Sequence, residues 1–371
     1  MMEQNLCCVF RVFATYRESI YTLIDQEFNA DFYFGTSTIP IKEADRTRLR
    51  GYRGSFGCVE LYKGVWWFEG IINLAFRNYQ IYLVDGNLQC ISFWMLLLFN
   101  KLLGKKTYVW THGWYGREGI VKKIIKKIYY SLVTGVFLYG EYARNLMIEK
   151  GYAANKLFCI ANSLDYQKQL KYRNETKKTS IFHQHFENEY PVIIYVGRLQ
   201  KVKKFELLVQ AVDLLAQRNF FVNLILVGDN VDIDNLDEIL NLSISKKRIW
   251  HLGALFDEQK LSEYFYNADV CVSPGNIGLT AIHAFMYGCP VITHDNFVNQ
   301  MPEFEVIENM KTGSFFKEGD LEDLSQKIYD WLLFSMNRRD MIREDCYKII
   351  DSKYNPFYQI NLLKRVLRQK E

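Results

Sequence analysis

Residues 270–292 read VCVSPGNIGLTAIHAFMYGCPVI and contain one complete unit of strand, loop, helix and strand. The apolar run at the start predicts a strand, which a Pro-Gly pair ends. In the helix that follows, Leu279, Ile282 and Met286 share one face, and Gly288 ends it before the second strand begins. This order of elements is typical of a parallel sheet.

The loop of this unit carries two glycines, Gly275 and Gly278, at the carboxyl end of the first strand. Glycines let backbone N–H groups approach a ligand, and the N-terminus of the next helix carries a partial positive charge. These features predict a phosphate site. The loop has neither P-loop spacing nor a GxGxxG motif, so an ordinary strand–helix turn without a ligand is the alternative.

The composition is that of a globular protein with two domains. The chain has 371 residues, of which 49% are hydrophobic and 24% are charged, which is enough apolar material for buried cores. A net charge of +4 is too small to indicate a nucleic-acid partner. The cysteines form no CxxC pair and predict reduced core residues of an intracellular protein. They are Cys7, Cys8, Cys58, Cys90, Cys159, Cys271, Cys289 and Cys346.

We expect a cytoplasmic location. The segment MMEQN at residues 1–5 lacks the basic start and apolar core of a signal peptide. The longest apolar run, near residues 91–99, is shorter than the roughly 20 residues of a membrane-spanning helix. Peripheral contact with the inner face of the cell membrane stays open.

Strands and helices alternate along both halves of the chain, which predicts two doubly wound α/β domains. Residues 36–60 give no assignment, residues 71–77 are expected to be helical, and the charged residues 165–189 predict a linker between domains with its flanking helix. Strands are expected at 6–10, 31–34, 81–84, 107–110, 135–139 and 158–160 in the first half, and at 192–196, 224–227, 249–253, 270–273 and 291–292 in the second.

Two cations follow the first strand of the second half. Arg198 comes directly after this strand and Gly197, and Lys203 stands at the start of the next helix. Ligands of α/β sheets bind outside the carboxyl ends of the strands, so both charges are expected to meet a diphosphate there. Lys203 lies at the helix end that disfavours a cation, which also favours an anionic ligand. A solvated pair of surface cations is the alternative.

A series of motifs in the second half resembles the C-terminal domain of GT-B glycosyltransferases of family 4. The resemblance covers about 160 residues, and THG at 111–113 and NSLD at 162–165 extend it into the first half. The motifs are YVGRL at 195–199 with Lys203, LVGD at 226–229, HLG at 251–253, and ADV at 268–270 through GCPVI at 288–292.

The resemblance implies a GT-B architecture, in which two Rossmann-like doubly wound domains face each other across a cleft. Residues 1–170 would form the acceptor-binding domain, and residues 190–350 would form the nucleotide-sugar-binding domain. The C-terminal helix, about residues 355–371, would pack back on the first domain.

The resemblance also implies roles for individual residues. Arg198 and Lys203 match the pair that grips the donor diphosphate, and His112 matches a histidine near the reacting sugar, so these three are the catalytic candidates. A satisfied buried histidine is the alternative for His112. Residues 278–280 match the helix start that faces the phosphates and the donor sugar. The donor-binding candidates are Gly197, Arg198, Lys203, Gly228, Gly278, Leu279, Thr280 and His283.

The chain departs from the family's Glu-x7-Glu signature at both ends. Gly275 stands where the family has the glutamate that faces the donor sugar, and His283 stands where it has the glutamate that grips the ribose. A histidine can still hydrogen-bond a diol, so ribose binding is expected to survive. Three further candidates for the site are Asn276, Glu303 and Glu305, with solvated loop charge as the alternative for the two glutamates.

The implied function is that of a retaining glycosyltransferase of hexosyltransferase type. It would move a sugar from a nucleotide-diphosphate sugar to a glycan or lipid-linked acceptor in cell-surface polysaccharide biosynthesis, with no metal or other cofactor. The cations and the Gly278 helix start would stabilise the leaving diphosphate, and the departing phosphate would take the acceptor proton. The alternatives are a nucleotide-sugar epimerase of the same fold and a non-catalytic relative that binds a sugar nucleotide or a partner.

Residues 101–130 are strongly basic, with eight Lys or Arg residues against one acid, Glu118. In this segment Val121, Ile124 and Ile128 share one face of an expected helix. One interpretation is an interfacial helix that docks on anionic lipid. The other is an ordinary helix whose apolar face packs on the core and whose basic face is solvated.

Overall fold

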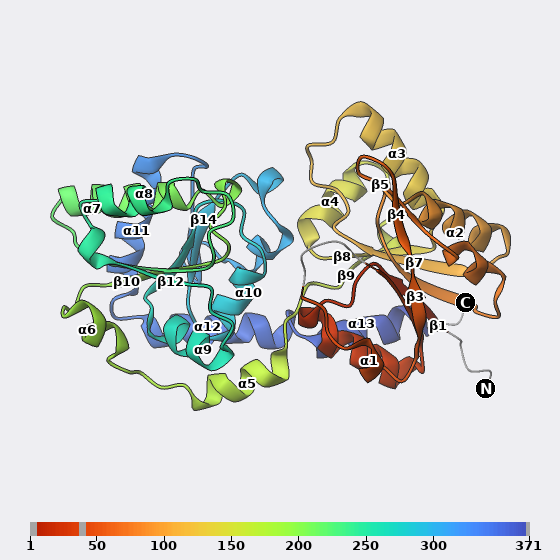
Figure 1. Ribbon diagram of the computed structural model, residues 1–371, viewed down its shortest axis with the longest axis horizontal. Helices are drawn as coiled ribbons and strands as arrows, with labels where there is room; N and C mark the ends of the chain where they lie inside the picture. Colours follow the sequence, from red (N-terminus) through yellow and green to blue (C-terminus); the bar gives the residue numbers. More distant parts are fainter. Residues whose placement is uncertain (1–5, 37–41, 369–371) are drawn as a thin grey trace. The chain divides into compact units, whose positions relative to one another are not determined.

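The computed structural model describes residues 6–36 and 42–368, which form two compact units (Figure 1). The first unit consists of the described residues up to Asp165 together with those from Asn355 onward, and the second unit is Tyr166–Tyr354. Each unit is built on one parallel sheet with helices on both faces. The fold class predicted from the sequence, two Rossmann-like α/β domains, is confirmed.

The sheet of the first unit has the strand order β3-β2-β1-β6-β7-β8-β9, and all neighbouring strands are parallel. A separate antiparallel hairpin follows β3. The strands are β1 Leu6–Phe10, β2 Asp31–Gly35, β3 Tyr52–Phe56, β6 Ile81–Asp85, β7 Lys106–Thr111, β8 Gly135–Leu138 and β9 Leu157–Cys159, with the hairpin β4 Cys58–Tyr62 and β5 Val65–Phe68. The α-helices are α1 Glu18–Phe28, α2 Ile91–Leu102, α3 Ile120–Ser131, α4 Glu141–Glu149 and α13 Pro356–Leu367.

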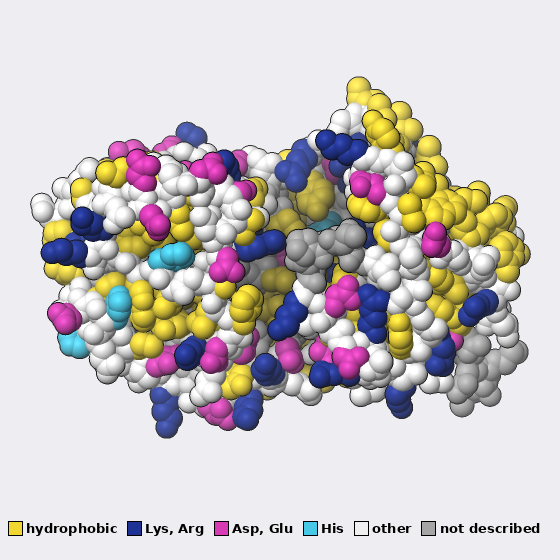
Figure 2. Space-filling model, in the orientation of Figure 1, with side chains coloured by type: hydrophobic (Ala, Val, Ile, Leu, Met, Phe, Trp, Pro, Cys, Tyr) yellow, Lys and Arg dark blue, Asp and Glu magenta, His cyan; other side chains and the backbone are white. Residues whose placement is uncertain are grey.

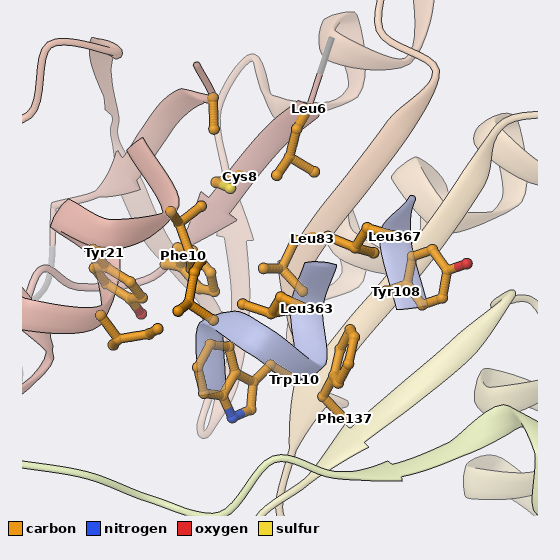
Figure 3. Packing of buried hydrophobic residues seen from close by; sticks show 14 of the residues in the cluster. Leu6, Cys8, Phe10, Tyr21, Leu83, Tyr108, Trp110, Phe137, Leu363 and Leu367 are labelled. Carbon is orange, nitrogen blue, oxygen red and sulfur yellow. The ribbon is translucent and has the colours of Figure 1, made fainter. Parts of the chain in front are cut away.

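Both faces of this sheet are buried, because successive residues of a strand point to opposite sides. Along β1, Cys8 and Phe10 pack in the cluster that α1 and α13 cover, whereas Cys7 and Val9 pack in the cluster beneath α2. Figure 3 shows the first cluster, where Leu363 of α13 lies among side chains of the central strands. The side-chain amide of Gln359 also ties α13 to the carbonyl of Ala161 (3.1 Å).

The sequence missed β3, in the unassigned residues 36–60, and the β4–β5 hairpin that begins at the end of that segment. β3 reads YRGSF and lies at the edge of the sheet, so its residues are half-exposed or exposed and give no apolar run. Residues 71–76, expected as part of a helix, form a 3₁₀ helix over Ile71–Phe76. Residues 37–41 of the unassigned segment lie outside the described part.

The sheet of the second unit has the order β12-β11-β10-β13-β14-β15, again with all neighbours parallel. Figure 1 shows helices on both of its faces. The strands are β10 Val192–Val196, β11 Asn223–Val227, β12 Ile249–Gly253, β13 Val270–Ser273, β14 Val291–His294 and β15 Gly313–Phe316. The α-helices are α5 Tyr166–Glu175, α6 Ile181–Phe186, α7 Phe205–Gln217, α8 Leu236–Leu242, α9 Glu258–Asn267, α10 Leu279–Met286, α11 Leu321–Ser335 and α12 Arg339–Ser352.

Residues 165–189, expected as a linker with one flanking helix, contain two helices, α5 and α6. α5 belongs to the second unit, where Arg173 forms a two-bond ion pair with Asp351 of α12 and Thr176 bonds Ser262 of α9. The polar composition that indicated a linker therefore reflects the exposed face of packed helices.

All eight cysteines are free thiols, and every one except the half-exposed Cys58 is buried, as the sequence predicted. In the described ranges, no helix is both long and apolar enough to cross a membrane.

Candidate functional site

The second unit has its topological switch point between β10 and β13. β10 comes first in the chain and lies centrally, with β11 on one side and β13 on the other. The connections that leave the carboxyl ends of β10 and β13 therefore run in opposite directions, and open α/β sheets bind ligands at this position. Gly197 and Arg198 follow β10, and the loop 274–278 follows β13. The residues predicted to bind a diphosphate thus meet at one edge of the sheet.

Lys203 is held against the loop after β13. Its ammonium Nζ donates to the backbone oxygen and to the side-chain Oδ1 of Asn276, at 2.7 and 2.8 Å. Burial and the neighbouring positive charge of Arg198 lower the pKa of Lys203, and the negative charge of Glu303 acts against them. Asn276, a further candidate from the sequence, therefore fixes the Lys203 ammonium in place.

Arg198 is exposed, and its guanidinium makes no hydrogen bond or ion pair with the residues that the structure describes. Lys203 likewise has no ion pair with a described carboxylate. Two adjacent cations without a bound carboxylate repel each other, and an anion between them would relieve that repulsion. The pair can therefore receive a diphosphate.

Gly275 has a steric role that the sequence did not reveal. Its N–H donates to the carbonyl of Lys203 (2.9 Å), so the loop after β13 and the turn that holds Lys203 pack backbone against backbone. A Cβ atom at residue 275 would collide with the carbonyl oxygen of Val202 and lie 2.6 Å from the Cα of Lys203. The family's glutamate does not fit at this position in the present backbone.

The helix α10 begins at Leu279, directly after Gly278, and its first N–H groups have no acceptor within the helix. The hydroxyl proton of Thr280 is already used within the protein, since Oγ1 donates to the carbonyl of Val196 at the end of β10 (3.1 Å). That bond ties the helix start to the strand before Arg198. The backbone amides of Leu279 and Thr280, rather than the threonine side chain, are the groups suited to a phosphate.

Gln300 holds the loop 274–278 in place through hydrogen bonds. Sequence reasoning missed this residue. It is buried, and its Oε1 accepts from the N–H of Ile277 (2.8 Å), while Nε2 donates to Thr293 Oγ1 and to the carbonyl of His294 (both 2.9 Å). Thr293 in turn donates to the carbonyl of Ser273 (2.8 Å). No local motif marks a single glutamine for this role, because its partners come from two separate segments, the loop after β13 and the end of β14.

The other two predicted glycines shape the edge of the sheet. Gly228 has φ +151°, and a Cβ there would overlap the carbonyl oxygen of Gly197. The N–H of Gly197 donates to the carbonyl of Val227 (2.9 Å). These glycines let the ends of β10 and β11 approach closely beside Arg198.

The His283 side chain already has a partner within the protein, because it pairs with Glu258, the first residue of α9. Nε2 of His283 lies 2.7 Å from Oε1 of Glu258, which also accepts from Tyr287 (2.5 Å) and Gln169 (3.0 Å). Burial alone would raise the pKa of Glu258, but His283 and these hydrogen bonds lower it to about 2. A carboxylate therefore stands beside His283, where the family carries one on α10 itself.

Glu303 and Glu305 lie in a 3₁₀ helix, Pro302–Val306. Glu303 is 3% exposed, so solvated loop charge is the wrong interpretation for this residue. Its negative charge acts on Lys203, which brings it into the electrostatics of the site. Glu305 is half-buried.

His112 belongs to the first unit and follows β7 directly. Its Nδ1 is buried without a hydrogen-bond partner among the described residues, and its ring lies 4.7 Å from that of Tyr139. Burial, with the positive charge of Arg17, lowers the pKa of His112 to about 4. The alternative of a satisfied buried histidine is therefore wrong, and His112 is a neutral imidazole at physiological pH.

Gly113, the residue after His112, is held in place by Lys126, which also forms a buried ion pair with Glu118. The Nζ of Lys126 donates to the carbonyl of Gly113 (2.5 Å) and to Glu118 Oε1 (2.6 Å). Gly113 has φ +69°, and a Cβ there would lie 2.5 Å from a methyl carbon of Leu138.

Among the described residues, no three His, Cys, Asp or Glu side chains come together as a metal site.

Two Rossmann-like α/β units, the second with two cations at its topological switch point, match the architecture of solved GT-B glycosyltransferases. Residues 176–348 match the family model of Glycosyl transferases group 1, so this segment is a domain of that kind. The chain is a glycosyltransferase, as the sequence predicted. Its assignment to family 4 stays a prediction.

The chain is also similar to individual proteins. It is 25% identical to an uncharacterized 41.2 kDa protein in the cps region of Klebsiella pneumoniae, over 70% of this chain and 71% of that one. It is 22% identical to the capsular polysaccharide biosynthesis glycosyltransferase CapM of Staphylococcus aureus, over 65% and 63% of the two chains. The structure of HepE from Anabaena in complex with UDP covers 98% of this chain and 100% of its own, with a TM-score of 0.72 at 13% identity.

Proposed function

We propose that the chain transfers a hexosyl group from a UDP-sugar to a glycan or lipid-linked acceptor, with retention, during synthesis of a capsule or another cell-surface polysaccharide. The observation that carries the donor assignment is the pair of Arg198 and Lys203 beside the start of α10, without a bound carboxylate. The names of the two capsule relatives support the pathway, and the UDP complex of HepE supports the base.

In the proposed reaction, the bond between the anomeric carbon and the β-phosphate oxygen breaks, and a bond to the acceptor oxygen forms on the same face. The acceptor proton passes to the departing phosphate. Arg198, Lys203 and the first amides of α10 stabilise the negative charge that develops on the leaving diphosphate, without a metal. His112, neutral at physiological pH, donates or accepts a hydrogen bond that orients a sugar hydroxyl.

Glu258 and His283 together are the proposed partners of the ribose. The Oε1 atom of Glu258 is occupied by three donors, whereas Oε2 accepts no hydrogen bond from the described residues. An ionised carboxylate oxygen is a strong acceptor for a ribose hydroxyl. The pair would therefore replace the single glutamate of the family's signature.

A thermal-shift panel of UDP, GDP and ADP, each with and without Mg²⁺, tests the donor site. A ligand at 100 times its dissociation constant adds about 2.7 kcal/mol to the free energy of unfolding, which is readily measured. We expect UDP alone to stabilise the chain without metal, and Arg198→Ala and Lys203→Ala each to abolish the shift. Lys201→Ala is the matched control, because Lys201 lies in the same turn but pairs with Asp234 (3.3 Å). Full stabilisation of both site variants by UDP would refute the diphosphate assignment.

Product analysis then separates the remaining alternatives. Transfer requires an acceptor, whereas an epimerase would convert the UDP-sugar to its epimer without one. If none of the three nucleotides stabilised the wild-type chain, a non-catalytic relative that binds a partner would be the better description.

A further inference from the structure

The helix α3 exposes its apolar side chains and buries a lysine, which is the reverse of an ordinary surface helix. Ile120, Val121, Ile124 and Ile128 have 77, 71, 56 and 53% of their surface exposed. The residues of α3 that face the core are instead Lys126, Tyr129 and Tyr130. The interpretation of α3 as a helix with its apolar face on the core is therefore wrong.

The exposed residues form one continuous stripe. Residues 120, 124 and 128 are four apart, as are 121 and 125, so they align along the outer side of the helix. We call Ile120, Val121, Ile124, Ile125 and Ile128 the α3 face. Figure 2 shows apolar side chains gathered over α3 and continuing over α2, where Leu98, Leu102 and Leu103 are also exposed. The two helices are joined where Lys101 donates to the carbonyl of Ser131 (2.9 Å).

Every exposed charge in the segment 101–130 is positive. Its one acid, Glu118, is buried and paired with Lys126. Lys123 and Lys127 flank the α3 face on one side and Lys122 on the other, and all three are exposed. An apolar stripe bordered by lysines fits the surface of an anionic bilayer, where the apolar side chains contact acyl chains and the lysines contact negatively charged headgroups.

We propose that the α3 face docks on an anionic lipid bilayer, with α3 lying in the plane of the interface. The five apolar side chains enter the boundary between headgroups and acyl chains, and the flanking lysines meet lipid phosphates. This inference rests on the surface of the first unit and is independent of the donor site.

A second copy of the chain fits this surface less well. Two α3 faces in contact would bring their flanking lysines together without a described acid between them, and like charges in contact are destabilising. Anionic lipid supplies the opposite charge along the whole length of the helix. Charge complementarity therefore selects the bilayer.

The inner side of α3 links this surface to His112. Lys126 holds the carbonyl of Gly113, the residue next to His112, while the outer side of the same helix presents the α3 face. Docking would hold the His112 loop at a fixed depth relative to the lipid surface. Such an arrangement suits an acceptor that is itself anchored in the membrane.

Vesicle co-sedimentation of the full chain tests the proposal. We compare vesicles of phosphatidylcholine alone with vesicles in which about one third of the lipid is phosphatidylglycerol, at low salt. We expect wild type to bind the anionic vesicles and Ile124→Gln/Ile128→Gln to bind them about tenfold more weakly, since each isoleucine buries apolar surface in lipid. The control is Leu333→Gln/Met336→Gln, which removes two exposed apolar residues of the second unit and is expected to bind like wild type.

The electrostatic part is tested with Lys123→Gln/Lys127→Gln. Removing two lysines should weaken binding about tenfold or more, because each basic residue near an anionic surface contributes on the order of 1 kcal/mol. Lys246→Gln/Lys247→Gln, in the second unit, is the charge-matched control and should bind as wild type does. Raising the salt to about 0.5 M should release the wild-type chain.

Three results would overturn the proposal. Wild type could ignore anionic vesicles at low salt, or the Ile124→Gln/Ile128→Gln variant could bind as tightly as its control. Alternatively, wild type could be a dimer that this variant converts to a monomer, with no vesicle binding in either form, which would make a second copy the occupant. The assay contains no sugar nucleotide, so its outcome is distinguishable from failure of the proposed transferase reaction.

Discussion

Glu258 Oε1 lies 2.7 Å from His283 Nε2, although Glu258 is the first residue of α9 and His283 lies within α10. The chain lacks a glutamate at residue 283, but Glu258 of the neighbouring helix α9 places a carboxylate beside His283. An ionised Glu258 with a pKa of about 2 keeps its charge throughout the physiological range. In the proposed function, Glu258 takes over the ribose contact of the glutamate that is missing at residue 283.

Glu258→Gln should reduce discrimination for the ribose hydroxyls. Glutamine keeps an oxygen for the three donors but replaces the other carboxylate oxygen with an amide nitrogen. We expect UDP to bind about tenfold more weakly, because a hydrogen bond to a charged group contributes about 1.5–3 kcal/mol. Calorimetry with UDP and 3′-deoxy-UDP measures the preference, which should fall toward unity, whereas Glu263→Gln, also on α9, should keep it. An unchanged preference in Glu258→Gln would limit Glu258 to a structural role.

Gly275→Ala should destabilise the second unit and weaken nucleotide binding. The new methyl group meets the backbone at Val202 and Lys203, and overpacking of this kind costs typically 1–3 kcal/mol. Denaturant unfolding measures the loss. For stability alone, Gly278→Ala is the matched control, since its Cβ would meet nothing closer than 3.9 Å, the side chain of Met301. Equal stability of the two variants would mean that the loop moves to accept the methyl group.

The sequence predicted the parallel architecture because its buried strands are continuous apolar runs, such as 192–196 and 270–273. It missed β3 because an edge strand is only partly buried and needs no such run. The apolar periodicity of α3 was also visible, but periodicity does not say which face is outward. The buried pair of Lys126 and Glu118, together with the buried Tyr129 and Tyr130, shows which face of the helix is turned to the core.

In the candidate site, the motif glycines and cations were readable because their spacing follows the ends of single strands. Glu258 and Gln300 were not, since each acts on residues 23 to 25 positions away along the chain. For Gly275, the sequence indicated only that the family's glutamate is absent at this position. Its contact with Lys203 depends on how two loops pack, which no local pattern encodes.

His112 should make stability depend on pH below neutrality. Its pKa is about 4 in the folded chain and near 6.5 when unfolded, so the unfolded state binds more protons between these values. The stability that the neutral ring provides is full above about pH 6.5 and is lost as the pH falls toward 4, by up to about 3 kcal/mol. Comparison of unfolding free energies of wild type and His112→Gln across this range measures it. Parallel pH profiles for the two proteins would contradict the burial of a neutral ring.

Lys126→Met should be among the most destabilising single changes in the first unit. It leaves the carboxylate of Glu118 buried without its cation and frees the carbonyl of Gly113, and breaking a buried pair in this way costs about 3–5 kcal/mol. Adding Glu118→Gln should recover part of the loss, because the remaining partner is then neutral. Lys127→Met, one residue along on the exposed side, should change stability by no more than about 0.5 kcal/mol. Denaturant unfolding of the four proteins measures these differences. If Lys126→Met were as stable as Lys127→Met, the inner side of α3 would not be fixed by this ion pair.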